Sequence, residues 1–321
     1  MDVHQRNGAS HDHIECLFGL NLVDEAPIVD PILIRGTLQE MKRKTVSFAT
    51  TLLLGAVLTS AFGEPIARAP KFLSAFWGLN DAMPQQICPA ATQLDGMPVT
   101  FSWLIDSNSI EPSDFRILRS DGTETTPTCA TLIPANEPNE TQTILLIGDV
   151  GDSAAGIISR NVRLVGQLVG HAPNSAQIKR FGNLKSPHVR SLGYGPYIVD
   201  AWILQPQLLA NDANRCAVGS TFLRVVWSGG ITDYPTANEV GDDVTAAYRV
   251  VYSVRSARPV SIAPLAIGDL NDGDNMHDLC LPELPKNAQI WSVGLPENLV
   301  QDPNGDPNRP QNFKLKGIKV R

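Results

Sequence analysis

The fold is decided by strand-like stretches, of which the clearest is Val99-Thr-Phe-Ser-Trp-Leu-Ile105. β-Branched and aromatic residues dominate this stretch, and such residues favour a pleated, half-buried strand. A second stretch, Phe115–Arg119, continues through Asp121-Gly122 into the threonine-rich residues 123–132. Because Asp-Gly is a strong signal for a hairpin turn, we expect the segments on either side of it to pair as antiparallel strands.

Short stretches of the same kind recur along the chain. Further candidate strands are residues 141–147, 161–169, 197–204, 221–227, 247–254 and 260–267. Turn-forming residues separate them, and the whole chain has 25 Gly and 24 Pro among 321 residues. Helical periodicity is best in Lys71–Leu79, which is only about two turns long. The pattern predicts an all-β fold of the β-sandwich type.

The overall charge argues against one class of partner. The chain carries 26 Lys and Arg against 33 Asp and Glu, a formal net charge of −7. Neutralising nucleic-acid phosphates requires clustered basic residues, and the longest run of these is Lys42-Arg43-Lys44. We therefore expect no nucleic-acid partner.

That basic run opens a segment typical of an export signal. Met41-Lys-Arg-Lys44 is followed by a mostly apolar stretch at residues 45–58 and by small residues at Thr59-Ser-Ala-Phe-Gly63. A positive start, a short apolar centre and small residues before the cleavage point describe a secretory signal peptide. We predict this signal at residues 41–63, with cleavage after Ala61 or Gly63.

The signal predicts the location of the mature protein and its domains. The apolar stretch is short of the roughly 20 residues that cross a membrane comfortably, so we expect no stable membrane span after cleavage; a signal anchor is the alternative. The protein is then secreted or periplasmic. Residues 1–40 are interpreted as a disordered leader or an over-extended gene prediction. A stretch rich in Gly, Pro, Asn and Ser divides the rest into a first domain at 64–170 and a second at 195–321.

The cysteines agree with export. Without Cys16 of the leader, an even set of four remains: Cys88, Cys129, Cys216 and Cys280. In an oxidising compartment such a set predicts two disulfides. Four cysteines allow three connectivities, and the sequence does not select among them. Our working hypothesis pairs Cys88 with Cys129 and Cys216 with Cys280, one bridge in each half.

The first half also resembles a known class of domain. Phe101–Asp106, Ser109-Ile110, Pro112 and Asp114-Phe115, followed by a Ser-Asp-Gly turn, are similar to the opening strands of bacterial immunoglobulin-like domains. The resemblance covers residues 98–147. It implies an immunoglobulin-like β-sandwich, and it says more about fold than about function.

The densest polar segment is an acidic loop at residues 268–278. Its candidate metal ligands are Asp269, Asn271, Asp272, Asp274 and Asp278. Calcium takes six to eight hard oxygen ligands, and short acidic loops supply them. The same residue types also favour turns for conformational reasons, so an exposed turn without a metal is the alternative. A second loop, Asp302-Pro-Asn-Gly-Asp-Pro-Asn308, resembles the start of a calcium loop or forms a rigid extended tail.

An enzymatic alternative comes from a second resemblance. Gly151-Asp-Ser153 looks like the Gly-Asp-Ser block of the SGNH ester hydrolases, and Asp274-Asn-Met-His277 resembles their late Asp-x-x-His block. The resemblance implies Ser153 as nucleophile, His277 as its base and Asp274 as the orienting acid. Such a hydrolase also requires an α/β scaffold and a Gly-x-Asn-Asp block, neither of which the sequence contains.

The aromatic residues offer one more way to bind a ligand. We expect Trp103, Trp202 and Trp227 in the core and leave Trp77 and Trp291 open to a binding role, such as stacking on a sugar ring. Arg224 and Arg249 are expected on solvated strand faces.

Together these patterns favour a secreted β-sandwich protein with a binding or structural role at the cell surface. We expect calcium as its only cofactor and an unidentified protein or glycan as its partner. The alternative is a secreted ester hydrolase using Ser153 and His277.

Overall fold

The computed structural model describes residues 69–206, 216, 221–255, 257–268, 270 and 272–320. The predicted leader at 1–40, the predicted signal at 41–63 and the candidate ligands Asp269 and Asn271 lie outside the described residues. The described residues belong to one compact unit of the chain.

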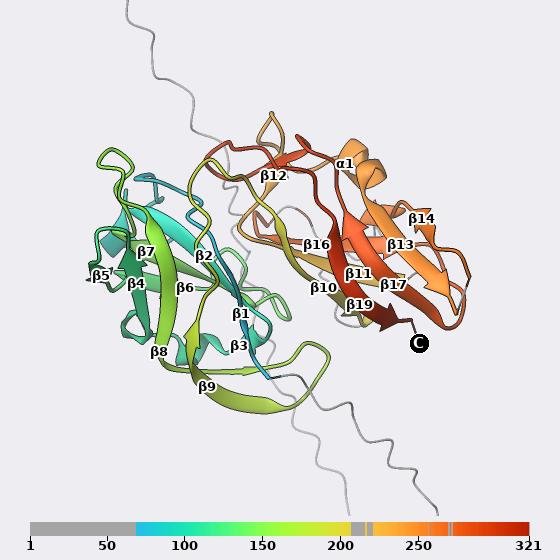
Figure 1. Cartoon of the computed structure of the whole chain (residues 1–321), viewed down its shortest axis with the longest axis horizontal. Helices are drawn as coiled ribbons and strands as arrows, with labels where there is room; N and C mark the ends of the chain where they lie inside the picture. The colour runs from blue at the N-terminus through green and yellow to red at the C-terminus, as the bar shows by residue number, and fades with distance from the viewer. Residues whose placement is uncertain are drawn as a thin grey trace, which may run out of the picture. The chain divides into compact units, whose positions relative to one another are not determined.

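Two antiparallel sheets form the first half of the described chain (Figure 1). The first has the strand order β1-β2-β7-β6, with bounds Phe72–Ala75, Asp95–Phe101, Thr143–Gly148 and Cys129–Thr131. The second has the order β3-β8-β4-β5, with bounds Leu104–Ile105, Ser159–His171, Phe115–Arg119 and Glu124–Thr125, and β9 (Ile178–Lys185) pairs with β8. Short 3-10 helices lie at Pro89–Ala91, Ser107–Ser109 and Pro112–Asp114.

Two further antiparallel sheets form the second half. One has the order β10-β11-β16-β15, with bounds Ile198–Leu204, Thr221–Trp227, Met276–Leu281 and Ala266–Ile267. The other has the order β14-β13-β17-β19, with bounds Val260–Ile262, Arg249–Val254, Ala288–Gly294 and Phe313–Lys319. A small pair joins β12 (Thr232–Asp233) to β18 (Val300–Gln301), and α1 (Asp242–Ala247) is the one α-helix among the described residues.

Each half packs its two sheets around a hydrophobic core, as the alternation of side chains along a strand requires. The first core includes Phe101, Trp103, Phe115 and Leu164, and the second includes Trp227 and other buried residues between Ile198 and Leu315. These observations confirm an all-β, sandwich-like fold. The first core also takes in Phe181 and Val189, so it continues past the expected domain end at residue 170.

The sheet β10-β11-β16-β15 differs from the others because its central strands are buried on both faces. All six residues of β16, and all of β11 after Thr221, are buried. On β11, Leu223, Val225 and Trp227 belong to the second core. The alternate residues of this strand lie on the opposite face, where Arg224 contacts Asn139 and Glu140 of the first half. This sheet is therefore the layer that the two halves share.

Most of the expected strands are present. The turn at Asp121-Gly122 joins β4 to β5, with Gly122 at a φ of +87°, a backbone conformation that suits glycine. The prediction of a single strand over residues 260–267 is wrong. The segment that contains Pro264 and Leu265 separates β14 from β15, and the two strands lie in different sheets. Lys71–Leu79 contains strand β1 in place of a helical segment. Strands β9, β16, β17 and β19 were not predicted.

Both disulfides have the hypothesised pairing. Cys88 bonds Cys129 and Cys216 bonds Cys280, with Cα–Cα distances of 6.5 and 5.4 Å. The first bridge ties the segment before β2 to β6, and the second ties residue 216 to the shared sheet at β16.

We expect replacement of Cys88 and Cys129 together by Ala to lower the free energy of unfolding by about 4 kcal/mol, because the closed loop restricts the unfolded chain. Urea denaturation of the variant and the parent measures this difference. Non-reducing peptide mapping checks the pairing, and a peptide that joins Cys88 to Cys216 or Cys280 would contradict it.

Candidate metal centre

The acidic loop enters strand β16 through two tight backbone turns. Asp272 Oδ1 accepts a hydrogen bond from Asp274 N at 3.1 Å, and Asp274 Oδ1 accepts one from Met276 N at 2.7 Å. Gly273 between them has a φ of +70°. The turn-forming role of these residues is therefore real, and it uses only one oxygen of each carboxylate.

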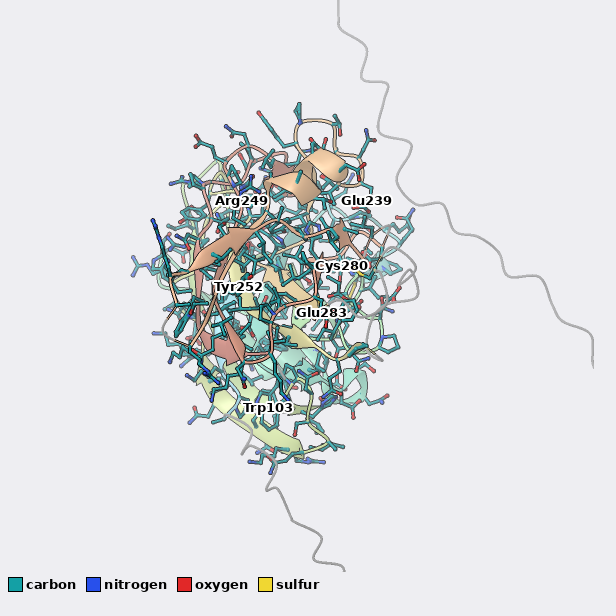
Figure 2. All side chains as sticks on the ribbon, turned by 90° about the vertical axis from the view of Figure 1, so that its right-hand side faces the viewer. Trp103, Glu239, Arg249, Tyr252, Cys280 and Glu283 are labelled. Atoms are coloured by element: carbon teal, nitrogen blue, oxygen red, sulfur yellow. A yellow bond between two sulfur atoms is a disulfide. The ribbon has the colours of Figure 1, made fainter. Side chains whose placement is uncertain are left out.

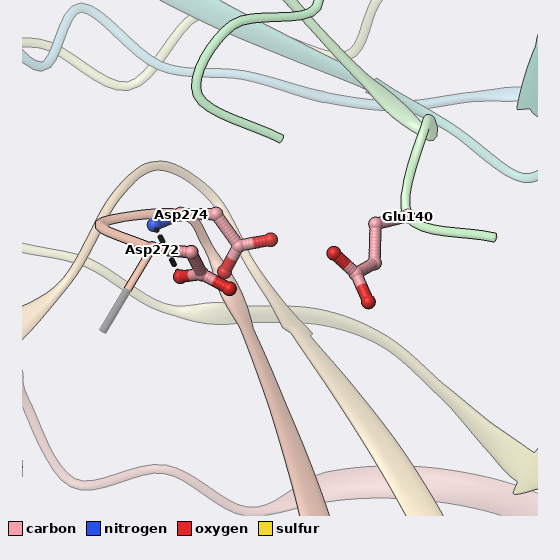
Figure 3. Close-up of side chains that lie close together, drawn as sticks. All are labelled: Glu140, Asp272 and Asp274. Carbon is pink, nitrogen blue, oxygen red and sulfur yellow. Dashed lines mark hydrogen bonds between the residues drawn. The ribbon is translucent and has the colours of Figure 1, made fainter. Parts of the chain in front are cut away.

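The structure adds a carboxylate that sequence reasoning missed. Glu140, from the loop before β7, lies opposite Asp272 and Asp274 (Figure 3). One oxygen from each of the three residues lies within 4.8 Å of the others. Glu140 and Asp274 are buried, and Asp272 is half-buried. Nothing in the sequence near residue 140 marks it as a ligand, because its partners lie more than 130 residues away.

Two of these carboxylates have oxygens without a hydrogen-bond partner in the described part of the chain. Glu140 Oε2 and Asp274 Oδ2 are both buried and unbonded. Burial raises the pKa of Glu140 to about 7, and Asp278 adds to this while Arg224 opposes it. Burial also raises the pKa of Asp274 well above its usual value, with further contributions from Asp272 and Glu140. Burial therefore favours the protonated form of both carboxyl groups.

Beside the cluster, Arg224 forms a buried ion-pair network. Its Nε and Nη2 donate to Asp278 Oδ1 and Oδ2 at 2.6 and 2.7 Å, and Nη2 also donates to Glu140 Oε1 at 2.9 Å. Its Nη1 donates to the carbonyl of Asn139 at 2.8 Å. The side chains of Arg224 and Asp278 are both 0% exposed. The expectation of a solvated Arg224 is therefore wrong, whereas Arg249 is exposed as expected.

This network accounts for Asp278. Cross-strand pairing of β11 with β16 places Asp278 directly opposite Arg224, and both carboxylate oxygens accept from the guanidinium. Asp278 is thus not among the carboxylates that converge. Arg224 contacts the carboxylates of Asp278 and Glu140, and Glu140 also lies beside Asp272 and Asp274, so the acidic groups of this neighbourhood outnumber its one guanidinium.

The residues of the hydrolase alternative are not brought together. His277 is buried, its Nδ1 is hydrogen-bonded to the Tyr248 hydroxyl at 2.8 Å, and Tyr248 accepts from Trp227 Nε1. Burial lowers the pKa of His277 to about 3, so the ring is neutral. Ser153 lies exposed in the turn between β7 and β8. Asp274 bonds Met276 N, and no hydrogen bond joins Ser153, Asp274 and His277 to one another within the described residues.

The second acidic loop is organised by its own backbone. Asp302 Oδ1 accepts from the backbone N–H groups of Asn304 and Asp306 at 3.0 and 2.9 Å. Burial raises the pKa of Asp302 to about 7. The two loops approach each other at Gly230, where a Cβ atom would lie 3.2 Å from the Gly273 carbonyl oxygen and 4.0 Å from Pro303 Cγ.

The tryptophans divide differently from the expectation. Trp103 and Trp227 are buried as predicted, and Trp202 is half-buried. Trp77, which was left open to a binding role, is 1% exposed and belongs to the first core. Trp291 is 39% exposed.

Comparison with known proteins adds no functional information. No protein-family model matches the chain, and no curated protein shows a significant match.

Replacing Arg224 by Met should lower the free energy of unfolding by about 3–5 kcal/mol, because it leaves Asp278 and Glu140 buried without their cation. Urea denaturation measures the loss. Arg180→Met, at an exposed position on β9, is the matched control and should change stability by less than about 0.5 kcal/mol. Equal effects of the two substitutions would show that the buried network does not stabilise the fold.

Proposed function

We propose that the chain is a secreted or periplasmic β-sandwich protein with a binding or structural role at the cell surface, stabilised by a calcium ion at Glu140, Asp272 and Asp274. The observation that carries the metal proposal is the convergence of three carboxylates, two of which keep a buried oxygen without a partner. Asp269 and Asn271 remain candidate ligands from the same loop.

The chemistry of this cluster favours calcium over softer metals. Its side-chain ligands are carboxylate oxygens, and hard oxygen sites suit calcium, magnesium or manganese, whereas zinc and copper prefer nitrogen and sulfur. Oxygens bound to calcium at about 2.4 Å can lie up to about 4.8 Å apart, which fits the separation found here. Water and loop carbonyls would complete the six to eight ligands.

The disulfides support export, and the proposed fold class is compatible with a binding role. Both disulfides suit an oxidising compartment. Among the described residues, no helix has the length and apolar character needed to cross a membrane. The resemblance of residues 98–147 to bacterial immunoglobulin-like domains, which we retain as a proposal, concerns the fold and is compatible with a binding or a structural role.

Calcium at 5 mM should raise the thermal midpoint by several degrees relative to protein in EDTA, because a ligand that binds only the folded state stabilises it by about 2 kcal/mol at fifty times its Kd. Differential scanning calorimetry measures the shift. Asp274→Asn should abolish the response and leave the metal-free protein at least as stable, since the amide keeps the shape of a buried carboxyl group whose ionised form is unfavourable there.

The matched control is Glu283→Gln, which removes an exposed carboxylate and should leave the calcium response unchanged. A full response in Asp274→Asn would place the ion elsewhere, and the absence of any shift in the parent protein would refute the metal proposal.

The calcium-induced shift should be larger at pH 8 than at pH 6. Below its pKa of about 7, Glu140 holds a proton that calcium must displace, at a cost of about tenfold in affinity per pH unit. In metal-free protein the raised pKa of Glu140 makes the folded protein less stable as the pH rises from 4.5 to about 7. The lowered pKa of His277 has the opposite effect below pH 6.5, where the folded protein becomes more stable as the pH rises. The difference between the thermal midpoints with calcium and with EDTA at each pH cancels the contribution of His277. A shift that shrinks with rising pH would contradict the assignment of Glu140.

A further inference from the structure

The outer face of the sheet β14-β13-β17-β19 carries side chains that do not pack into the second hydrophobic core. Ile290 and Val293 of β17 pack into the second core together with their partners Ile318 and Phe313 on β19. The register between β17 and β19 shifts between Ile290 and Ser292, so Ile290 and Val293 can both point inward while the backbone pairs Gln289–Lys319 and Ser292–Lys314 lie toward the other face; of these residues Ser292 is itself buried. Figure 2 views the protein from this side, with Arg249 and Tyr252 of β13 labelled.

Trp291 lies in the centre of this face and is held in a fixed orientation. Its strand pairs with β13 on one side and β19 on the other. The indole Nε1 donates a hydrogen bond to Ser253 Oγ at 2.8 Å. Opposite β17, Gly317 has a φ of +64°, and a Cβ atom there would lie 2.8 Å from Cζ3 of the indole. A glycine therefore lets the ring lie against the backbone of β19, where it remains 39% exposed.

The charge of this face is opposite to that of the whole chain. Its four strands contain Arg249, Lys314, Lys316 and Lys319 and no Asp or Glu, although the chain has a formal net charge of −7. All four of these basic residues are exposed. Lys314 and Lys319 lie up to about 17 Å apart along β19, on either side of the Trp291 level. Positive charge is thus concentrated around one exposed aromatic ring.

We propose that this face binds an acidic polysaccharide, with Trp291 stacking on a sugar ring and the lysines contacting its carboxylate or sulfate groups. Gln289 and Ser261 lie on the same outer face through their pairing with outward residues, and their side chains suit sugar hydroxyls. A single ring with no exposed aromatic neighbour on these strands suits one sugar better than a row of stacked bases. The proposal specifies the partner of the binding role proposed above and does not depend on the calcium centre.

The test is titration of the purified full chain with three probes: polygalacturonate, dextran sulfate and neutral dextran. It is carried out without added calcium, because polygalacturonate binds calcium itself. Isothermal titration calorimetry should show binding of at least one acidic probe and none of neutral dextran. Trp291→Ala should weaken this binding about tenfold or more, as loss of a central aromatic contact does, while Trp291→Phe, which keeps a ring, should weaken it less.

The charge contribution has its own matched pair of variants. Lys314→Gln with Lys319→Gln should weaken binding and reduce its dependence on salt, since fewer ion contacts are then screened. Lys71→Gln with Lys185→Gln removes the same charge from exposed positions in the first half and should leave binding unchanged. Calcium-dependent stabilisation should persist in all of these variants, which separates this proposal from the metal centre.

Three results would overturn the proposal: no binding of either acidic polymer, equal binding by Trp291→Ala and the parent, or equal losses in the two lysine pairs. Binding of a single-stranded oligonucleotide or of anionic lipid vesicles with higher affinity than both acidic polymers would also overturn it, in favour of a different anionic partner.

Discussion

The guanidinium of Arg224 joins the two halves of the protein at a fully buried position. It donates to Asp278 across its own sheet and to Glu140 and the Asn139 carbonyl of the first half. A buried pair of this kind contributes little net stability compared with apolar packing, but removing one partner is costly. We therefore infer that its main effect is on specificity, since the observed arrangement of the halves satisfies the acceptors of Asp278, Glu140 and Asn139 together.

The same geometry supports the proposal of a cation nearby. Arg224 satisfies Asp278 and one oxygen of Glu140, and the turn into β16 satisfies one oxygen of Asp274. The remaining buried oxygens point into a region of low dielectric, where ionised carboxylates are unfavourable. Protonation balances this charge at low pH, and in our proposal a divalent ion balances it at high pH, so the electrostatic balance of the acidic loop depends on the loop before β7.

Much of the fold follows from local sequence patterns, and the site follows only in part. Short β-branched stretches such as 221–227 predict strands correctly because packing and propensity agree there. Strand β16 was missed because Asp274, Asn275, His277 and Asp278 resemble a polar loop, although burial between two layers makes that segment a core strand. Arg224 was misplaced for the same reason, since an alternating pattern does not reveal that both faces of a sheet are covered. The role of Glu140 as a candidate ligand can be recognised only from the tertiary structure.

The sheet β10-β11-β16-β15 is the layer that the two halves share, with the second hydrophobic core on one face and the Arg224 network on the other. This arrangement sets how the protein can evolve. Independently folded domains that are joined only by linkers can be duplicated, exchanged or deleted one at a time, because each has its own complete surface. Here Arg224 and Asn275 hydrogen-bond Glu140 and Thr143 of the first half, so we expect the two halves to be inherited as a single piece and insertions to be tolerated at the outer loops.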